Sequence, residues 1–271
     1  MENSMPVEIR DILRNRVKEK LARDEVVASM TVRLVRNVEI ARMAASAGFD
    51  TLYVDVEHNG FSWDTTGQIC MAALAAGITP FVRVPSTAPE HVAGALNGGA
   101  LGVIAPHVRS AADARRVVAA AKFPPLGERS AGGPLPHLEF RSFPASQVDP
   151  ALNDATTVMV MMETLEALEH VEEIAAVDGM DMMMVGTSDL TAEMGIPGQY
   201  DDPRVRAAYA RTIAACRKHG KHVGVGGLAS RPDLTAEFVK MGARYVSTGT
   251  DIGFLLAEAT ARAKQVRELP T

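Results

Sequence analysis

The sequence is poor in aromatic residues and cysteine, and it has no long apolar run. Phe, Trp and Tyr make up 5% of the 271 residues, so the core must be mainly aliphatic. The two cysteines, Cys70 and Cys216, lie far apart in apparent helices, which argues against a disulfide framework and a thiolate metal site. No run of about 18 apolar residues is present, so no transmembrane helix is expected. The first residues lack the apolar segment of a secretory signal, and we therefore expect a cytoplasmic protein.

The chain also lacks an excess of positive charge. Its formal net charge is −5 and its pI about 5.8, which gives no electrostatic reason to expect nucleic acid or an anionic membrane as a partner. Apolar residues make up 47% and charged residues 23% of the chain, an ordinary composition for a globular protein. A chain of this length suits one large domain, and α/β barrels commonly reach this size.

Eight short apolar runs alternate with amphipathic segments of helical length. The runs are continuous, as is typical of parallel strands buried on both faces. Eight such strands, each followed by a helix, predict an α/β fold of the closed (β/α)₈ TIM-barrel type. The expected strands are residues 26–32, 52–56, 79–84, 102–106, 158–162, 182–185, 222–226 and 245–248.

Two segments stand apart from this alternation. Residues 1–25 read as a charged amphipathic N-terminal helix outside the barrel, which leaves residues 26–271 for the catalytic barrel. Residues 123–153 contain six prolines and little periodicity. A loop of that length inside a compact domain is usually functional or disordered.

Ionisable residues follow most of the predicted strands, at the end where barrels build their active sites. Glu163 and Asp189 follow neighbouring strands. Each has an ordinary structural explanation, because Glu is common in a first helical turn and Asp is a good N-cap. Together they indicate two carboxylates facing one mouth, where water and a chelating substrate could complete the oxygen shell of Mg²⁺ or Mn²⁺.

Strands two and three end in further charged residues. Asp55 and Glu57 lie on one side of their strand by its period of two, and His58 lies on the other. His58 is either a base, a ligand or a structural histidine. Arg83 ends a buried strand and needs a partner, which is either an acid such as Asp55 or a substrate oxyanion. The sequence gives weaker reasons to place five further residues at the mouth, namely Arg33, Arg36, Asn37, His107 and Arg129.

Five sequence blocks, in order, resemble the class II pyruvate aldolases. They are GFDTLYVDVEH (48–58), PFVRVPS (80–86), KFPPLGERSAG (122–132), METLEAL (162–168) and VGTSDLTAEMG (185–195). This group includes the 2-dehydro-3-deoxyglucarate and 4-hydroxy-2-oxoheptanedioate aldolases, with macrophomate synthase as a relative. The resemblance runs from about residue 26 to residue 260 and so covers most of the chain.

The resemblance implies a barrel of the phosphoenolpyruvate/pyruvate superfamily, usually a homohexamer of dimers that exchange their last helix. It implies that Glu163 and Asp189 hold Mg²⁺, Mn²⁺ or Co²⁺, that Arg83 faces the enolate oxygen, and that His58 works with an acid as the base. Further substrate contacts are implied around Glu57, Gly186, Thr187 and Ser188.

Two departures from the family pattern affect the base and the substrate pocket. Met161 stands where a Gln is common, and Asn97 stands where an Asp often reaches a neighbouring subunit to partner the histidine. We therefore expect Asp55 or Glu57 to partner His58.

We expect a metal-dependent carbon–carbon lyase that joins pyruvate to an aldehyde and cleaves 4-hydroxy-2-oxo acids. No lysine falls at a strand exit, which argues against a Schiff-base aldolase. The alternatives are oxaloacetate decarboxylation, citrate-type condensation, an annulation like that of macrophomate synthase, or a barrel without activity.

Overall fold

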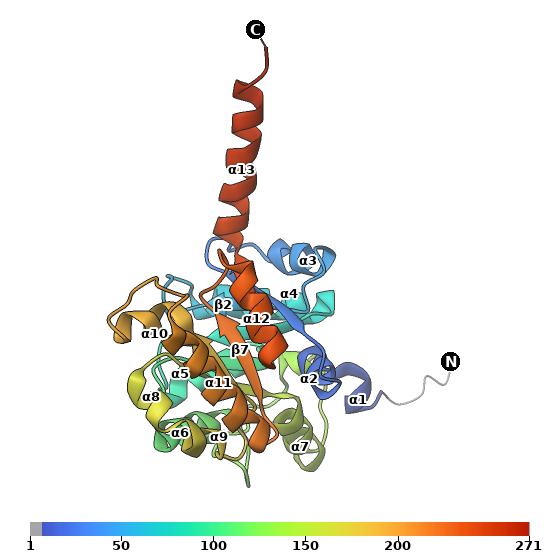
Figure 1. Ribbon diagram of the computed structural model, residues 1–271. Coiled ribbons are helices and arrows are strands. Elements are labelled where there is room, and N and C mark those ends of the chain that lie inside the picture. Colours follow the sequence, from blue (N-terminus) through green and yellow to red (C-terminus); the bar gives the residue numbers. More distant parts are fainter. Residues whose placement is uncertain (1–6, 271) are drawn as a thin grey trace.

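Eight parallel strands close into a barrel in the computed structural model, which describes residues 7–270 (Figure 1). The strands are hydrogen-bonded in sequence order, and β8 pairs with β1. The predicted TIM barrel is therefore confirmed, and all eight predicted strands end within two residues of the observed ones. The strands are β1 (Val27–Val32), β2 (Thr51–Asp55), β3 (Thr79–Arg83), β4 (Gly102–Ala105), β5 (Thr157–Met162), β6 (Met182–Gly186), β7 (His222–Gly226) and β8 (Tyr245–Thr250).

Helices follow each strand, and several of them start at a residue whose side chain caps the helix. The Ser62 side chain accepts a hydrogen bond from the backbone N–H of Thr65 at the start of α4, and Ser110 forms a capping box with Asp113 at the start of α6. Residues 165–175 form two short helices that meet at His170. The helices are α3 (Glu39–Ser46), α4 (Trp63–Ala76), α5 (Pro89–Asn97), α6 (Ala111–Ala121), α8 (Leu165–Glu169), α9 (Val171–Ala175), α10 (Thr187–Glu193), α11 (Pro203–Lys218), α12 (Pro232–Met241) and α13 (Asp251–Arg267).

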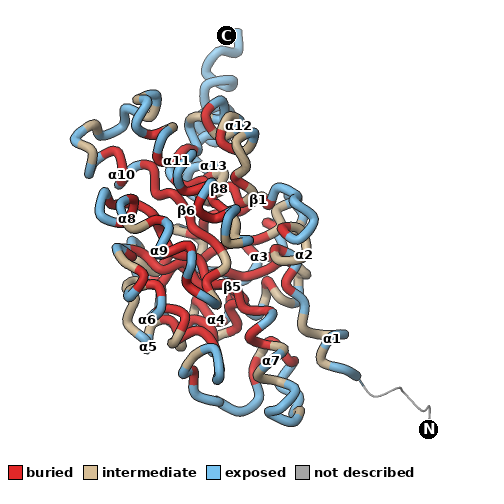
Figure 2. The backbone as a smooth tube through the Cα atoms, turned by 60° about the horizontal axis from the view of Figure 1, so that its bottom comes forward, coloured by how far each residue is buried: buried red, intermediate tan, exposed pale blue. Residues whose placement is uncertain are grey.

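Alternate residues of each strand face the inside of the barrel. Tyr53, Phe81, Met161, Met184 and Tyr245 belong to one buried cluster that fills the interior. Their chain neighbours pack outward under the helices in two further clusters, and Figure 2 shows the strands as a buried centre within a more exposed shell. Because the period of two continues past the strand ends, residues two positions beyond these side chains face the mouth.

The N-terminal segment contains two short helices in place of the one expected outside the barrel. They are α1 (Ile9–Ile12) and α2 (Arg16–Ala22), and residues 1–6 lie outside the described range. Val17 and Leu21 of α2 join the interior cluster. This helix therefore covers the end of the barrel opposite the mouth.

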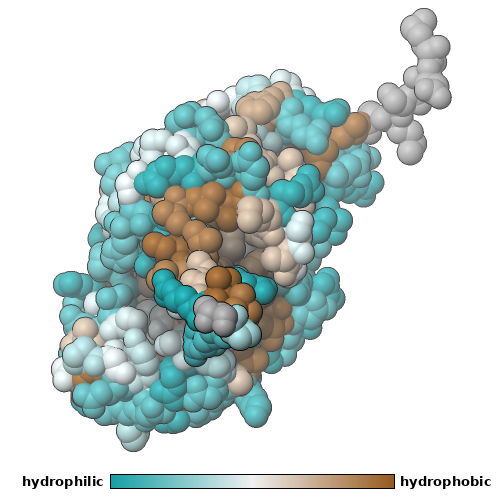
Figure 3. Space-filling model, turned by 90° about the horizontal axis from the view of Figure 1, so that it is seen from above, coloured by the Kyte–Doolittle hydropathy of each residue, from teal (hydrophilic) through white to brown (hydrophobic). Residues whose placement is uncertain are grey.

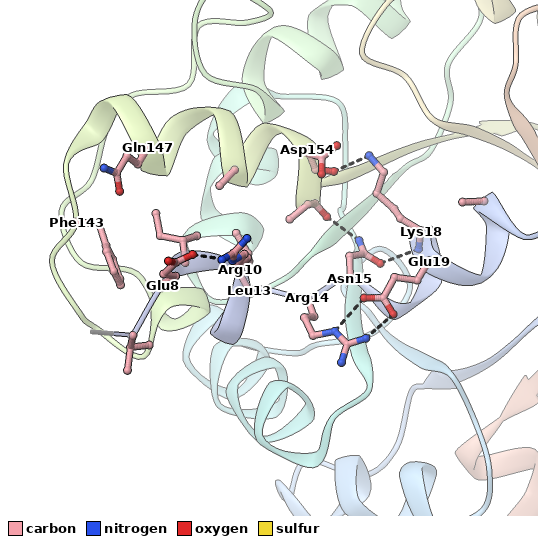
Figure 4. Close-up of a pocket in the computed structure, with 15 residues that line it drawn as sticks. Glu8, Arg10, Leu13, Arg14, Asn15, Lys18, Glu19, Phe143, Gln147 and Asp154 are labelled. Atoms are coloured by element: carbon pink, nitrogen blue, oxygen red, sulfur yellow. Dashed lines mark hydrogen bonds and ion pairs between the residues drawn. The ribbon is translucent and has the colours of Figure 1, made fainter. Parts of the chain in front are cut away.

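The proline-rich segment at residues 123–153 is folded against the barrel. It contains the 3₁₀ turn η1 (Pro136–Leu138) and α7, which begins within it (Ala145–Ala155), and Phe123, Leu135 and Leu152 form a small core of their own. Between this segment and the N-terminal helices lies a cleft of about 950 Å³, shown in Figure 4. Its charged groups already have partners, such as Arg14 with Glu19 and Lys18 with the carbonyl of Asp154.

The last helix, α13, projects from the body of the protein (Figure 1). Of its residues only Asp251 is buried. Within residues 7–270, no helix combines the length and the apolar character that crossing a membrane requires.

Candidate active site

A buried arginine–aspartate pair forms the floor of the barrel mouth. Asp55 and Arg83 are paired residues of β2 and β3, and each lies two positions beyond an aromatic side chain of the interior. Arg83 donates from Nε to Asp55 Oδ1 at 2.9 Å and from Nη2 to Oδ2 at 2.7 Å. Its remaining nitrogen, Nη1, lies 3.1 Å from Glu57 Oε2. Three nitrogens of the guanidinium are thus fixed by two acids.

Both members of this pair are held in their charged forms. Burial alone would raise the pKa of Asp55, but the hydrogen bonds and charge of Arg83, together with the charge of Arg33, lower it below its usual value. Burial also works against the charge of Arg83, yet its pKa is raised because of the bond to Asp55 and the nearby acids. Arg83 therefore provides a fixed positive charge at the mouth.

Glu57 lies between three basic side chains. Its Oε1 is 3.1 Å from Nε2 of His107, and its Oε2 is 3.5 Å from Nε2 of His58. The side chain of Glu57 is 7% exposed, whereas those of His58 and His107 are 52% and 63% exposed. The structure places Glu57 beside the His58 ring, while Asp55 meets only the backbone N–H of His58, at 3.4 Å. Both imidazoles can therefore exchange protons with solvent or a ligand.

Glu163 follows β5 and is buried beneath His107. Its Oε1 accepts the backbone N–H of His107 at 2.7 Å and lies 3.2 Å from Nδ1 of the same residue. His107 adopts a left-handed backbone conformation with φ of 58°, which is uncommon for a residue other than glycine. Burial raises the pKa of Glu163, with further contributions from Glu57 and Asp189, although the bond from His107 opposes the shift.

Asp189 lies in the first turn of α10, which follows β6, the neighbour of the strand β5 that precedes Glu163. Its side chain is exposed, and its charge acts on Glu163. Gly186 separates the two strand exits: a Cβ atom there would lie 3.0 Å from Glu163 Oε2. The neighbouring hydroxyl of Thr187 is turned away from the mouth and bonds Gly226 O and Tyr209. The hydroxyl of Ser188 is exposed and lies 3.3 Å from that of Tyr200.

The acids fit a divalent cation that takes only part of its shell from the protein. Within residues 7–270, no basic side chain pairs with Asp189, and no group of three or more His, Cys, Asp or Glu side chains forms a metal cluster. Two carboxylates are hard oxygen donors, and Mg²⁺ characteristically binds one or two of them and keeps several waters. The charges of Glu57 and Asp189 acting on Glu163 agree with such a site.

Two residues at the mouth had weak support from the sequence. His107 follows β4 and contacts both Glu57 and Glu163. Arg33 follows β1, and its Nε lies 2.8 Å from Asp55 Oδ2. Their only sequence signal is their place just after a strand. Asn97 does not reach these groups and accepts a hydrogen bond from Arg129, while Met161 lies beside Arg83, with its sulfur 3.9 Å from Nη1.

A closed β/α barrel with buried charged residues at the carboxyl ends of its strands has the general form of a barrel enzyme. The sequence matches the HpcH/HpaI aldolase/citrate lyase family over residues 30–258. The chain belongs to this family.

Curated relatives and solved structures agree with this assignment. A 4-hydroxy-4-methyl-2-oxoglutarate aldolase of Hapsidospora irregularis is 38% identical over 94% of this chain and 96% of its own length. A 4-hydroxy-2-oxo-heptane-1,7-dioate aldolase of Salmonella dublin is 33% identical over 82% and 84%. An HpcH/HpaI aldolase from Desulfitobacterium hafniense has a TM-score of 0.88 with 32% identity, covering 93% and 97%. Macrophomate synthase, at 22% identity, shares the fold, with a TM-score of 0.74 over 92% and 89%.

Proposed function

We propose that this protein is a divalent-metal-dependent aldolase that cleaves 4-hydroxy-2-oxo acids to pyruvate and a carbonyl compound, and catalyses the reverse addition. The relatives named above support the reaction class, and their names indicate two diacids to test as substrates. The observation that carries the proposal is that Arg83, Glu163 and Asp189 end or follow β3, β5 and β6 at the same end of the closed barrel.

Glu163 and Asp189 are the residues that would hold the metal. Mg²⁺, Mn²⁺ and Co²⁺ all accept such an oxygen shell. A bound cation would supply a Lewis acid that favours negative charge on the C2 oxygen of the oxo acid. Backbone N–H groups at Gly186, Thr187 and Ser188 begin α10 beside Asp189, and we expect them to contact the substrate carboxylate.

Arg83 stabilises the charge that develops when the carbon–carbon bond breaks. In the cleavage direction the C4 hydroxyl loses its proton, the C3–C4 bond breaks, and the electron pair moves toward C3 and the C2 oxygen. C3 then takes up a proton to give pyruvate. Because two acids already fix the guanidinium, its remaining protons on Nη1 and Nη2 offer a preorganised positive charge.

Proton transfer falls to the imidazoles that flank Glu57. His58 lies 3.5 Å from Glu57 through Nε2 and is exposed at the mouth, so we propose it as the base that takes the C4 hydroxyl proton. Glu57 orients the ring. His107 contacts Glu57 as well as Glu163 and is the second candidate for this role. Asp55 acts indirectly, because its carboxylate holds Arg83 in place.

A substrate panel tests the reaction. Metal-free protein would be supplied in turn with Mg²⁺, Mn²⁺ and Co²⁺, together with 4-hydroxy-4-methyl-2-oxoglutarate or 4-hydroxy-2-oxoheptane-1,7-dioate. We expect pyruvate release that requires the metal. Oxaloacetate is run in parallel, and rapid CO₂ release without cleavage of either hydroxy acid would contradict an aldolase.

Removing one carboxylate tests the metal site directly. Glu163→Ala should abolish both Mn²⁺ binding and turnover. Glu169→Ala, which removes an exposed acid of α8, is the matched control and should bind Mn²⁺ normally. Normal turnover by Glu163→Ala would contradict the proposal.

We also propose that the protein is a homo-oligomer in which copies exchange α13, with a hexamer expected from the family resemblance. The α13 helix leaves the barrel, and Ser247, Thr248 and Thr250 of β8 are only partly buried, whereas β2 to β6 are buried throughout. Apolar side chains gather on the face from which it projects (Figure 3). The exposed ones are Leu34, Val38, Met43, Ile252, Phe254, Leu255 and Leu256.

Multi-angle light scattering tests this assembly. Leu255→Asp should reduce the mass of the wild-type oligomer, because it places a charge in the proposed interface. Arg262→Ala on the same helix, whose exposed partner is Glu258, should not. A monomeric wild-type protein would contradict the proposal.

A further inference from the structure

We propose that Arg33 binds a carboxylate on the acceptor half of the substrate, so that the enzyme selects carbonyl acceptors that carry an acid. The inference rests on the proposed function, because it concerns the substrate part that lies beyond the carbon–carbon bond. It assigns a role in substrate specificity to a residue other than the Asp55–Arg83 pair and the two proposed metal ligands.

The backbone of β1 directs Arg33 to the mouth. Ser29 and Thr31 face the barrel interior, where their hydroxyls bond Tyr245 at 2.7 Å and Ser247 at 3.2 Å. Arg33 is the next residue in this alternation. Its backbone N–H donates to Asp251 Oδ1 at 2.9 Å, and the same carboxylate accepts from the N–H groups of the next two residues. The position of Arg33 is therefore fixed by the start of α13.

The guanidinium of Arg33 has donors that the protein does not use. Its Nε lies 2.8 Å from Asp55 Oδ2, but the geometry is not that of a hydrogen bond. In the part of the chain that the structure describes, its terminal nitrogens have no hydrogen-bond partner, and the side chain is 35% exposed. Asp55 is already bound by two nitrogens of Arg83, so it neutralises Arg33 only in part.

A second arginine in the same loop, Arg36, differs from Arg33 because its donors bind the protein. Arg36 donates to the carbonyls of Leu34 at 3.1 Å and Gly60 at 3.5 Å, and its guanidinium lies over the ring of Phe61 at 4.8 Å. Its donors are directed at the protein itself. Arg33 instead presents the planar pair of terminal nitrogens that suits a carboxylate.

The strand order places Arg33 across the mouth from the proposed metal pair. In the closed barrel β1 lies opposite β5, and Arg33 follows β1 while Glu163 follows β5. An oxo acid held at Glu163 and Asp189 would therefore extend its acceptor half toward Arg33. The diacids proposed as substrates above carry an acid in that half.

Two acceptors of equal chain length test the inference in the condensation direction. Succinic semialdehyde carries a carboxylate and butanal does not, and each is added to pyruvate with Mn²⁺. Arg33→Ala should lower kcat/KM for succinic semialdehyde by roughly 30–100-fold, as expected for a lost bond between charged groups, and for butanal by less than about fivefold. Arg33→Lys should recover part of the loss, and Arg36→Ala should change neither reaction by more than about twofold.

The losses of kcat/KM with the two acceptors show whether Arg33 recognises the acceptor carboxylate or only positions other residues of the site. An equal loss with both acceptors would overturn the inference, because Arg33 would then act by positioning Asp55 and Arg83. No loss with either acceptor would overturn it as well. Arg33→Gln, which keeps most of the aliphatic stem, replaces the Ala variant if that protein does not fold.

An equilibrium measurement separates this inference from the proposed reaction. Calorimetry with 2-oxoglutarate and 2-oxopentanoate compares a diacid and a monoacid of equal length without turnover. We expect Arg33→Ala to weaken binding of 2-oxoglutarate about tenfold or more and to leave 2-oxopentanoate unchanged within about twofold. Equal affinities of wild type and Arg33→Ala for 2-oxoglutarate would overturn the inference even if the aldolase reaction is observed. The expected difference between the two ligands would support the inference even if no cleavage is observed.

Discussion

Both ends of the barrel bury polar side chains, but the groups that satisfy them differ. At the closed end, Lys122 donates to the carbonyls of Asn153 at 2.7 Å and Thr156 at 2.6 Å, and Asn15 donates to the carbonyl of Ala155 at 2.6 Å. At the mouth, side chains are paired with one another, as Asp55 is with Arg83 and Glu57 is with His107.

The difference shows which end is available for chemistry. A side chain bonded to backbone carbonyls ties two chain segments together, and a ligand cannot take its place without unfolding them. A side chain paired with an exposed side chain, as Glu57 is with His107, can exchange that partner for a substrate without unfolding a chain segment. We therefore expect changes at the mouth to affect catalysis and changes at the closed end to affect stability.

The largest effect in this comparison should come from Arg83→Lys at the mouth. The ammonium keeps the positive charge but cannot make the two parallel bonds to Asp55. We expect kcat to fall by about 10²–10³-fold, while the melting temperature changes by a few degrees. Steady-state kinetics measure kcat, and thermal unfolding measures the melting temperature. A variant that loses stability but keeps its rate would contradict the expectation that changes at the mouth affect catalysis and changes at the closed end affect stability.

The corresponding change at the closed end is Asn15→Ala. Asn15 caps α2 by accepting the N–H of Lys18 at 3.0 Å and donates to Ala155 O at 2.6 Å (Figure 4). Loss of the cap and an unsatisfied carbonyl should lower the free energy of unfolding by roughly 2–4 kcal/mol. Urea denaturation measures this, and kcat should stay within about twofold of wild type. A large fall in kcat with unchanged stability would contradict the comparison.

A pH dependence of stability should also arise at the closed end. His137 donates from Nε2 to Ala100 O at 2.9 Å, and burial lowers its pKa from 6.5 to about 4. Between these values the unfolded chain binds a proton that the native protein does not. The stabilisation is present above pH 6.5 and is lost as the pH falls toward 4, by about 3 kcal/mol for this group.

The variant His137→Gln isolates this contribution. Its amide can still donate to Ala100 O, but it has no titratable group. Urea denaturation at pH 7, 5 and 4 should show a steeper loss for wild type than for the variant. Parallel curves would show that His137 does not carry the dependence.

The smallest effect in this comparison should come from Gly186→Ala at the mouth. The backbone of Gly186 has φ of −81°, which alanine accepts, but the new Cβ would lie 3.0 Å from Glu163 Oε2 and from the Met161 methyl carbon. A small displacement of Glu163 should weaken Mn²⁺ binding and lower kcat roughly tenfold, with little change in melting temperature. Unchanged Mn²⁺ affinity would show that Glu163 has room to adjust.

The sequence alone determined the barrel and which strand exits carry ionisable residues. Continuous apolar runs such as Val158–Met162, alternating with segments of helical length, indicate parallel strands that are covered on both faces. The alternation of side chains along each strand then places Asp55, Arg83 and Glu163 at the mouth, because this alternation depends only on local backbone geometry.

Tertiary structure decided which of these residues meet and what covers the opposite end. Glu57 rather than Asp55 lies beside the His58 ring, and His107 joins Glu57 to Glu163. Those contacts join residues of β2, β4 and β5 through side-chain rotamers and a left-handed backbone at His107, which no local pattern specifies. The burial of Val17 and Leu21 under the barrel likewise depends on the interior they complete, because an apolar helix face alone does not specify the surface it covers.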